Sequence, residues 1–457
     1  MSQKHRTCFD AAKRGNVACM HTVAVCGTGY VGLVTAACFA QLGNDVVAYD
    51  ADITKVAMLR AGQLPFHEPS LGAVVARGIA NGSLRFAGSA AEALVGREIV
   101  FIAVGTPVAP LGDADLTYVR QAARDIATFA SSDLLVVNKS TVPVETVDVV
   151  ARLLERHGAN HRFMVASNPE FLREGSAVDD FMHPDRIVIG TGDAAAASLL
   201  KDLYAPIDAP FFVVEPHTAE MIKYAANAFL ATKLSFVNEL SNICDAVGAN
   251  IDDVLAGISY DRRIGRAYMQ PGIGFGGSCL PKDVSALAHV ARAHAIEPAM
   301  LDAVLDVNRR QIVRAVSLIE GRVGELDGTR GALLGLSFKP DTDDVRESPA
   351  IALARALHTR GSELRVHDPA AMSAARPLLR DGVEYVDDPY EATEGAQYVV
   401  VATPWDLYRS LDWQRVCEVM QRGNLFDMRN ALDARRLREV GFSYVGLARP
   451  APATISA

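Results

Sequence analysis

Short runs of apolar residues recur along the chain and alternate with helical patterns. The first unit runs from His21 to Asp50, where the apolar runs HTVAVCG and DVVAYD flank a helix-like stretch rich in small residues. Further apolar runs predict strands at residues 98–104, 134–140, 162–167, 186–190 and 211–214. Strands that alternate with helices predict a mainly parallel, doubly wound sheet.

The pattern changes at about His217. Residues 218–248 contain no proline and no glycine before Gly248, which predicts one long helix. Further helical sequence covers 284–319, with a break near Pro298. From Gly331 the alternation returns, with a helix expected at 348–361 and strands at 331–338, 363–369, 396–404 and 424–430.

The two ends of the chain therefore look like variants of one design. We expect an α/β protein with two Rossmann-like, doubly wound domains joined by a long central helix and a helical middle segment. The expected boundaries are a flexible N-terminal extension (1–19), a first α/β domain (20–215), a central helical domain (216–325), a second α/β domain (326–445) and a tail (446–457).

Composition narrows the class of protein. The 457 residues are 50% hydrophobic, enough for two or three cores, and the net charge of -9 disfavours general binding to nucleic acid or anionic membranes. Seven cysteines without a CxxC pair form neither a disulfide framework nor a zinc site, which fits a reducing cytoplasm. No apolar run approaches the ~18 residues of a membrane span. We expect no metal and no membrane insertion.

A glycine motif follows the first predicted strand. Gly27, Gly29 and Gly32 form GxGxxG around Tyr30 and Val31, at the start of the predicted helix. These glycines permit a tight turn, close approach of a pyrophosphate, and close helix packing. Asp50 ends the second strand, where an acid binds the ribose 2′-hydroxyl and favours NAD over NADP. The alternative is a glycine-rich turn that binds nothing.

Cys279 lies in GFGGSCLPKD, residues 274–283, beside Lys282 and Asp283. A neighbouring cation lowers the pKa of a thiol, and the thiolate is the nucleophile. Most cysteines are structural, so packing remains the alternative.

Other candidate residues occur in pairs. Glu170 and Glu174 would share one face if their segment were helical, or they are solvent-facing charges. Lys223 and Asn227 have the same spacing on the long helix, where a lysine is more often a snorkelling stem than a catalytic ammonium.

The second α/β domain has FKPDTDDVRES after its first strand and no GxGxxG. Lys339 and Arg346 of this segment could hold phosphates in the crevice of the sheet. Alternatively, they pair with the aspartates of their own loop.

Together these segments resemble a known family. The motifs are GTGYVG, VGTP (104–107), KSTVP (139–143), NPEFLREG (168–175), KYAANAFLATKLSFVNE (223–239), RIG (263–265), GFGGSCLPKD and FKPDTDDVRES. They resemble, in order and over residues 20–435, the UDP-glucose 6-dehydrogenase group of the UDP-glucose/GDP-mannose dehydrogenase family.

The resemblance implies a cytoplasmic, homodimeric enzyme that uses NAD to oxidise UDP-glucose to UDP-glucuronate in a four-electron reaction. Its first domain would bind NAD, its central domain would form the dimer, and its last domain would bind the UDP-sugar. Cys279 would form a thiohemiacetal and then a thioester. GDP-mannose 6-dehydrogenase, with the same chemistry, is the nearest rival. A non-catalytic nucleotide-binding protein is a rival of another class.

The resemblance also implies residue roles. The expected catalytic residues are Cys279, Lys223, Asp283, Glu170, Asn227 and Thr141. The expected NAD-binding residues are Gly27, Gly29, Tyr30, Val31, Gly32, Asp50, Lys55, Thr106, Ser140, Glu174, Lys282 and Arg346. The expected substrate-binding residues are Phe171, Leu172, Lys223, Asn227, Arg263, Tyr268, Gly276, Phe338, Lys339 and Arg429, with Arg263 reaching the partner subunit's site.

Overall fold

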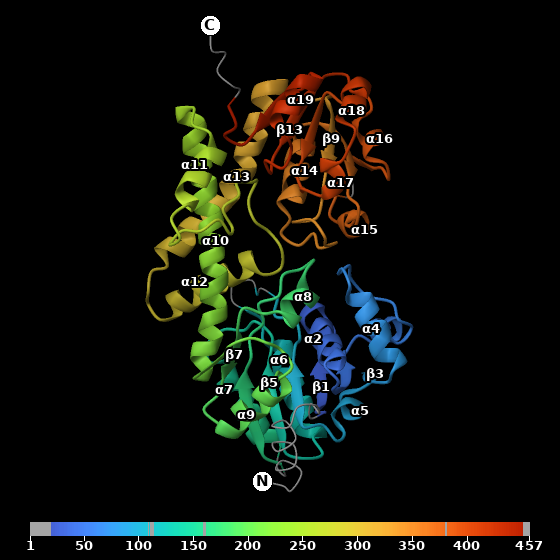
Figure 1. The fold of residues 1–457 in the computed structure, drawn as a ribbon, viewed down its shortest axis with the longest axis vertical. Coiled ribbons are helices and arrows are strands. Elements are labelled where there is room, and N and C mark those ends of the chain that lie inside the picture. Colours follow the sequence, from blue (N-terminus) through green and yellow to red (C-terminus); the bar gives the residue numbers. More distant parts are fainter. Residues whose placement is uncertain (1–19, 108, 110–113, 159–160, 380–381, 451–457) are drawn as a thin grey trace. The chain divides into compact units, whose positions relative to one another are not determined.

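The computed structural model describes residues 20–107, 109, 114–158, 161–379 and 382–450. It divides into two compact units, Met1–Ala225 and Ala226–Ala457. Figure 1 shows a parallel sheet covered by helices in each unit. The predicted extension at residues 1–19 lies outside the described residues.

The first unit contains an eight-stranded sheet in the order β3-β2-β1-β4-β5-β6-β7-β8. The part from β3 to β6 is parallel and has the strand order of a dinucleotide-binding fold. A single antiparallel bridge, Ser167 to Gly190, joins β6 to β7. The strands are β1 (Thr22–Cys26), β2 (Asp45–Tyr49), β3 (Leu84–Ala87), β4 (Ile99–Ile102), β5 (Leu134–Asn138), β6 (Phe163–Ser167), β7 (Ile187–Gly190) and β8 (Phe211–Val214).

Helices cover both faces of this sheet because successive strand residues point to opposite sides. Val23 and Val25 join the core beneath α2, α4, α8 and α9, whereas Ala24 and Cys26 join the core beneath α5, α6 and α7. The helices are α2 (Tyr30–Gln41), α3 (Ile53–Arg60), α4 (Leu71–Ala80), α5 (Ala90–Leu94), α6 (Thr117–Phe129), α7 (Thr146–His157), α8 (Ala177–Met182) and α9 (Ala194–Leu203).

The second unit contains a six-stranded parallel sheet in the order β11-β10-β9-β12-β13-β14. Numbered from its own first strand, this is again 3-2-1-4-5-6, so the prediction of two Rossmann-like sheets is confirmed. The strands are β9 (Arg330–Leu334), β10 (Glu363–His367), β11 (Val383–Tyr385), β12 (Tyr398–Val401), β13 (Asn424–Asp427) and β14 (Ser443–Gly446).

The long helix predicted after His217 is α10, Pro216–Val247, and the boundary between the units falls within it. The predicted break near Pro298 separates α12 from α13, and α13 packs with α14 on the second sheet. Among the described helices, none has the length and apolarity required to cross a membrane. The remaining helices are α11 (Ile251–Ser259), α12 (Leu280–Ala293), α13 (Ala299–Val323), α14 (Pro349–Thr359), α15 (Met372–Ala375), α16 (Pro389–Thr393), α17 (Asp406–Arg409), α18 (Trp413–Val419) and α19 (Ala434–Val440).

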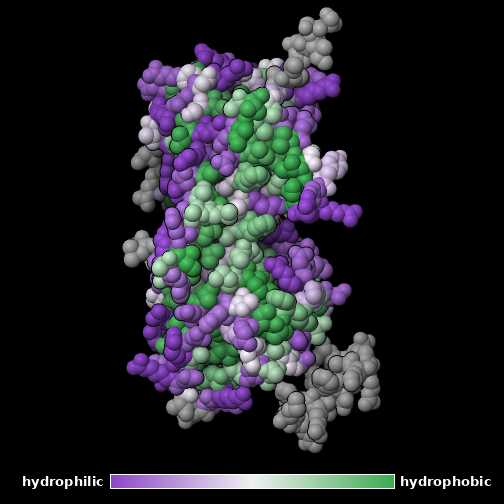
Figure 2. Space-filling view, turned by 90° about the vertical axis from the view of Figure 1, so that its left-hand side faces the viewer, coloured by the Kyte–Doolittle hydropathy of each residue, from purple (hydrophilic) through white to green (hydrophobic). Residues whose placement is uncertain are grey.

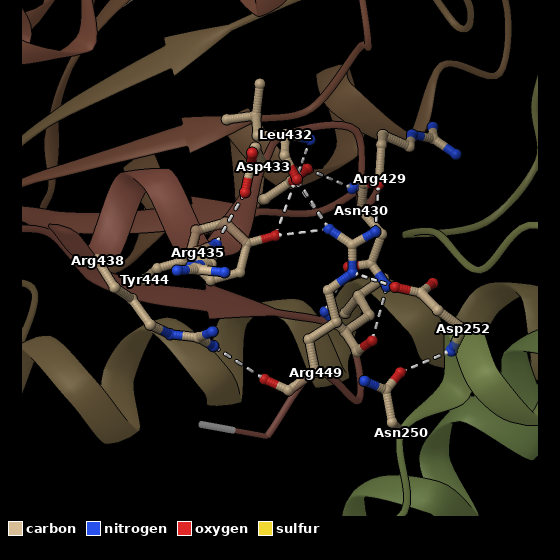
Figure 3. Close-up of polar contacts among 12 residues, drawn as sticks. Asn250, Asp252, Arg429, Asn430, Leu432, Asp433, Arg435, Arg438, Tyr444 and Arg449 are labelled. Carbon is tan, nitrogen blue, oxygen red and sulfur yellow. Dashed lines mark hydrogen bonds and ion pairs between the residues drawn. The ribbon is translucent and has the colours of Figure 1, made fainter. Parts of the chain in front are cut away.

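The structure describes residues 446–450 of the predicted tail, and these residues are held by contacts within the second unit. Ala448 is fully buried, and its carbonyl accepts a hydrogen bond from Ile251 N at the start of α11. Arg449 donates to Asp252 at 2.6 Å, to the Asn430 carbonyl at 2.8 Å and to the Leu432 carbonyl at 3.0 Å (Figure 3). The segment is ordered because its guanidinium satisfies loop carbonyls and joins β14 to α11.

We expect Arg449→Met to lower the stability of the second unit by about 1–3 kcal/mol, because it removes donors from partly buried acceptors. Both tryptophans, Trp405 and Trp413, are buried in this unit, so urea unfolding followed by their fluorescence reports on it. Arg435→Met is the control, because the Arg435 side chain is 90% exposed and pairs only with Glu439. The control should change stability by less than about 0.5 kcal/mol. Equal unfolding midpoints for the two variants would contradict this account.

Candidate active site

The glycine loop joins β1 to α2 with a different constraint at each glycine. Gly27 has φ of +100°, and a Cβ there would lie 2.6 Å from the carbonyl oxygen of Ala103. A Cβ on Gly32 would overlap the carbonyl oxygen of Gly27. A Cβ on Gly29 would meet nothing within 4 Å. Two glycines therefore serve the fold, and Gly29 leaves its side of the loop open to a ligand.

Asp50 lies at the carboxyl end of β2, beside this loop. Its Oδ2 accepts hydrogen bonds from Thr28 N and Thr28 Oγ1, both at 2.8 Å, and from Lys55 Nζ at 3.2 Å. Its Oδ1 accepts from Asp52 N at 3.0 Å, which leaves it further capacity for a ribose hydroxyl. Burial raises the pKa of Asp50, but the bonds from Asp52 and Thr28 and the charge of Lys55 outweigh it and lower the pKa. The carboxylate is thus fixed and charged.

The motifs VGTP and KSTVP follow β4 and β5 and are hydrogen-bonded to each other. Thr106 Oγ1 donates to the Thr141 carbonyl at 2.8 Å, and Ser140 Oγ donates to the Val104 carbonyl at 2.7 Å. Parallel strands bring their carboxyl ends to one edge, so these residues share an edge with the glycine loop. Tyr30 and Val31 begin α2 at that edge.

Glu170 and Lys223 form a buried ion pair with Oε1 and Nζ 3.0 Å apart. The Lys223 side chain is only 5% exposed, so the snorkelling interpretation is wrong. Burial raises the pKa of Glu170, but the charge of Lys223 and the Leu172 N–H outweigh it and keep the pKa below the ordinary value. The site therefore holds a carboxylate in direct contact with a buried lysine side chain.

The segment that carries Glu170 is a loop, so a shared helical face with Glu174 is excluded. Leu172 N donates to Glu170 Oε2 at 2.6 Å, and the Phe171 ring lies 5.4 Å from Lys223 Nζ. These predicted residues therefore gather around the ion pair. Glu174 is half-buried further along the loop and near the hydroxyl of Tyr30.

Two buried carboxylates that the sequence does not single out hold these loops. Glu68 accepts hydrogen bonds from the Tyr30 hydroxyl, from Gly175 N at 2.6 Å and from Ala177 N at 2.8 Å. Glu220 of α10 accepts from the backbone of Glu145 and Val147 at the start of α7. Their roles depend on contacts that span between 38 and 109 residues of sequence, and no local motif signals them.

In the second unit, Cys279 immediately precedes α12, which has Pro281 in its first turn. The N-terminus of a helix stabilises negative charge, which favours the thiolate form of a cysteine there. Ser278 Oγ lies 3.6 Å from Cys279 Sγ. The five cysteines in the described part of the chain are all free thiols, and Cys279 is partly exposed.

Asp283 lies one turn after Cys279 and is fully buried. Its Oδ1 accepts from Lys282 Nζ and its Oδ2 from Asn227 Nδ2, both at 2.6 Å. The carboxylate thus has a cation on one oxygen and an amide on the other, which fixes its orientation.

The glycines before Cys279 are crowded by other parts of the second unit. A Cβ on Gly274 would lie 2.8 Å from Asn308 Oδ1, one on Gly276 would overlap the Glu347 carbonyl, and one on Gly277 would lie 2.7 Å from the Phe338 ring. Contacts within the protein therefore account for these glycines, and room for a ligand is not needed to explain them.

The predicted residues of the second sheet have mixed outcomes. Arg346 forms a two-pronged ion pair with Asp344 of its own loop, as the alternative interpretation expected. Lys339 Nζ lies 5.6 Å from the Phe338 ring. Neither residue's contacts here identify a ligand.

Arg429 has the clearest signature of anion binding. Its guanidinium donates to the carbonyls of Ala402 and Gly274 at 2.9 Å, and among the described atoms its Nη2 is a buried donor without an acceptor. Burial lowers the pKa of Arg429 to about 10. A buried cation with an unused donor favours an anionic ligand.

Arg263 and Tyr268 lie between α11 and α12. Arg263 is exposed and pairs with Asp261 at 2.6 Å. Tyr268 has φ of +60°, which is rare for a tyrosine and is often found at functional sites.

Comparison with known proteins agrees with these features. Three models of the UDP-glucose/GDP-mannose dehydrogenase family match the chain: the NAD binding domain at 21–208, the central domain at 217–310 and the UDP binding domain at 332–434. The chain belongs to this family. The glycine loop and Asp50 fit NAD, and the protein is an NAD-dependent dehydrogenase.

Individual relatives cover almost the whole chain. UDP-glucose 6-dehydrogenase TuaD of Bacillus subtilis is 40% identical over 433 residues, 94% of each protein. The structure of a UDP-glucose dehydrogenase from Pyrobaculum islandicum is 45% identical, with a TM-score of 0.89, and covers 95% of this chain and 100% of that one. The structure of a GDP-mannose dehydrogenase from Pseudomonas aeruginosa is 34% identical, with a TM-score of 0.53, over 93% and 99%.

The glycine loop predicts opposite effects for two alanine substitutions. Gly29→Ala should leave the melting temperature unchanged and raise the KM for NAD at least about tenfold, because the new methyl fills the open approach to the loop. Gly32→Ala should lower the melting temperature, because its methyl overlaps Gly27. Thermal unfolding without ligand and NAD titration of each variant measure both effects. If the Gly29→Ala variant bound NAD with unchanged affinity, the prediction that NAD approaches the loop at Gly29 would be wrong.

Proposed function

We propose that this dehydrogenase is a UDP-glucose 6-dehydrogenase that works through a covalent intermediate on Cys279. The observation that carries the proposal is the partly exposed Cys279 at the N-terminus of α12, one turn from the buried Asp283. A two-electron alcohol dehydrogenase needs no nucleophilic thiol, whereas oxidation to an acid benefits from one.

The proposed reaction proceeds in four steps at C6 of the glucose. Loss of a hydride from C6 and a proton from its hydroxyl gives the aldehyde. Sγ of Cys279 then adds to C6, and the carbonyl oxygen takes a proton to give the thiohemiacetal. Loss of a second hydride and the hydroxyl proton gives the thioester, and water then breaks the C–S bond. NAD supplies the hydride acceptors, so UDP-glucose, two NAD+ and water give UDP-glucuronate, two NADH and three protons.

The proposed catalytic roles are those that the family resemblance implies. Lys223 would stabilise the oxyanions that form at C6, with Asn227 as a hydrogen-bond donor to the sugar. Asp283 would hold a water for proton transfer, with Thr141 as a second polar contact. Glu170 would act as the base for the water that cleaves the thioester.

The proposed binding roles are also those that the family resemblance implies. The residues that would bind NAD are Gly27, Gly29, Tyr30, Val31, Gly32, Asp50, Lys55, Thr106, Ser140, Glu174, Lys282 and Arg346. The residues that would bind the UDP-sugar are Phe171, Leu172, Arg263, Tyr268, Gly276, Phe338, Lys339 and Arg429. The unused donor of Arg429 supports its assignment to the diphosphate.

We propose UDP-glucose rather than GDP-mannose as the substrate because the chain is more similar in sequence to a UDP-glucose dehydrogenase. Identity is 45% to the UDP-glucose dehydrogenase structure and 34% to the GDP-mannose dehydrogenase structure, over a similar share of the chain. A nucleophilic thiol must stay reduced, which supports action in the cytoplasm.

We further propose a homodimer formed through α10. Phe229, Phe236 and Ile243 recur at seven-residue intervals and are 66%, 54% and 54% exposed, and Val247 is 72% exposed. Figure 2 shows hydrophobic side chains gathered on the face that carries α10. Seven-residue spacing suits helix packing about a two-fold axis, so the expected occupant is α10 of a second copy.

Counting NADH per sugar nucleotide tests the reaction. The wild type should form two NADH per UDP-glucose consumed, and Cys279→Ser should lower the rate of UDP-glucuronate release at least about a thousandfold. Cys417→Ser is the control, because Cys417 is a partly buried residue that packs against a core cluster of the second sheet, and this variant should keep the full yield. One NADH per sugar, or an unimpaired Cys279→Ser, would exclude the mechanism. If the enzyme oxidised GDP-mannose and not UDP-glucose, GDP-mannose would replace UDP-glucose as the proposed substrate.

The dimer predicts that Phe236→Glu gives a monomer, because a carboxylate would be buried without a partner at the interface. Sedimentation velocity of the wild type and variant measures the state. Leu407→Glu, a change of the same type at a residue 42% exposed on α17, should leave the wild-type state intact. A Phe236→Glu variant that sediments like the wild type would remove α10 as the interface.

A further inference from the structure

A third charged side chain, Lys139, is buried beside the Glu170–Lys223 pair. It follows β5 directly and is 5% exposed. Its Nζ donates to Asn168 Oδ1 at 3.0 Å and to the Tyr204 hydroxyl at 3.2 Å. Its hydrogen-bond partners are therefore an amide and a phenol, and it forms no ion pair with any described carboxylate. A buried ammonium in this setting has a large desolvation cost.

Asn168, the main partner of Lys139, begins the loop that carries Glu170. Its backbone N–H donates to the Asn138 carbonyl at 2.9 Å, and its side-chain amide donates to the Val188 carbonyl at 2.7 Å. Its Oδ1 also accepts from the Tyr204 hydroxyl at 2.6 Å. Lys139 thus completes a set of bonds that fixes the loop two residues before Glu170.

Lys139 also acts on the pair through its charge. The titratable groups that face it are Glu170 of the loop, Lys223 of α10 and Tyr204 at the end of α9, and the Phe181 ring of α8 lies 6.0 Å away. Burial lowers the pKa of Lys139 to about 7, Glu170 opposes this shift and Lys223 adds to it. In return, the positive charge of Lys139 helps to lower the pKa of Glu170.

We propose that Lys139 is a positioning residue for Glu170: it fixes the 168–172 loop through Asn168, so that Glu170 is held where it can act in cleavage of the thioester. The inference rests on the proposed function, because it assigns Lys139 to the step in which Glu170 acts as base. A side chain that only filled space would need neither the charge nor the bond to Asn168.

Trapping of the covalent intermediate tests this role. Wild type, Glu170→Gln, Lys139→Met and Lys201→Met are mixed with UDP-glucose and NAD, quenched in acid, and weighed by intact-protein mass spectrometry. Glu170→Gln should accumulate the Cys279 thioester, and Lys139→Met should accumulate it too, with release slowed about tenfold to a hundredfold. Lys201→Met removes an exposed lysine of α9 and should behave like the wild type.

The outcomes separate the two proposals. If Glu170→Gln accumulates the thioester and Lys139→Met releases product at the wild-type rate, the role of Lys139 is overturned and the proposed function stands. If no variant, including Glu170→Gln, shows an adduct, the covalent mechanism fails and the role of Lys139 fails with it.

A second variant covers the case in which Lys139→Met does not fold. Lys139→Gln keeps an amide donor for Asn168 and removes the charge. The charge of Lys139 helps to lower the pKa of Glu170, so its loss should raise that pKa, and product release should fall off at a pH about one unit higher than in the wild type as the pH is lowered. An equal loss of rate at every pH, with the wild-type midpoint, would indicate a purely structural role and overturn the proposal.

Discussion

The buried ion pair between Glu170 and Lys223 is the constraint around which the first unit is organised. Each charge would be costly to bury alone, so the 168–172 loop and α10 must keep the two atoms in contact. Lys139 adds a second cationic side chain beside the pair, so the group carries a net positive charge. Because the group has more positive than negative charges, its side chains must be held in place. The hydrogen bonds of Asn168 to β5 and β7 hold the loop that carries Glu170.

The loop after the first strand of each sheet has a similar backbone, but the carboxylate beside it differs in its hydrogen bonds. Gly335 after β9 has φ of +101°, close to the +100° of Gly27, and Asp368 after β10 accepts from Leu336 N and Ser337 N much as Asp50 accepts from Thr28 N. Asp368 is 3% exposed and also accepts from Trp405, Ala370 and Ala371. The oxygens of Asp368 are therefore occupied by donors from the protein. Asp50 of the first sheet has further capacity to accept a hydrogen bond, so the two equivalent carboxylates differ in their availability to a ligand.

Sequence patterns predicted the central strands of both sheets and missed three edge strands, β3, β11 and β14. Central strands are covered on both faces and read as continuous apolar runs such as VVV at 399–401. Edge strands are short and partly exposed, as VEY of β11 shows, so they lack that signal. Residues 446–450 were missed for a related reason: the contacts that order Arg449 come from Asn430, Leu432 and Asp252, far away in sequence.

The candidate site shows which chemistry a motif can and cannot reveal. Gly32 and Asp50 were predictable because their contacts are with neighbours within about thirty residues, and Gly27 because its positive φ belongs to a known turn, although the atom that crowds it is in Ala103. Gly274, Gly276 and Gly277 also form a glycine-rich segment, but the reason for these glycines is different. Asn308, Glu347 and Phe338 occupy the space that a side chain would need. A glycine-rich segment therefore indicates close approach without saying what approaches. Near Cys279 the approaching groups are protein, so these glycines are evidence about packing and not about the chemistry of the thiol.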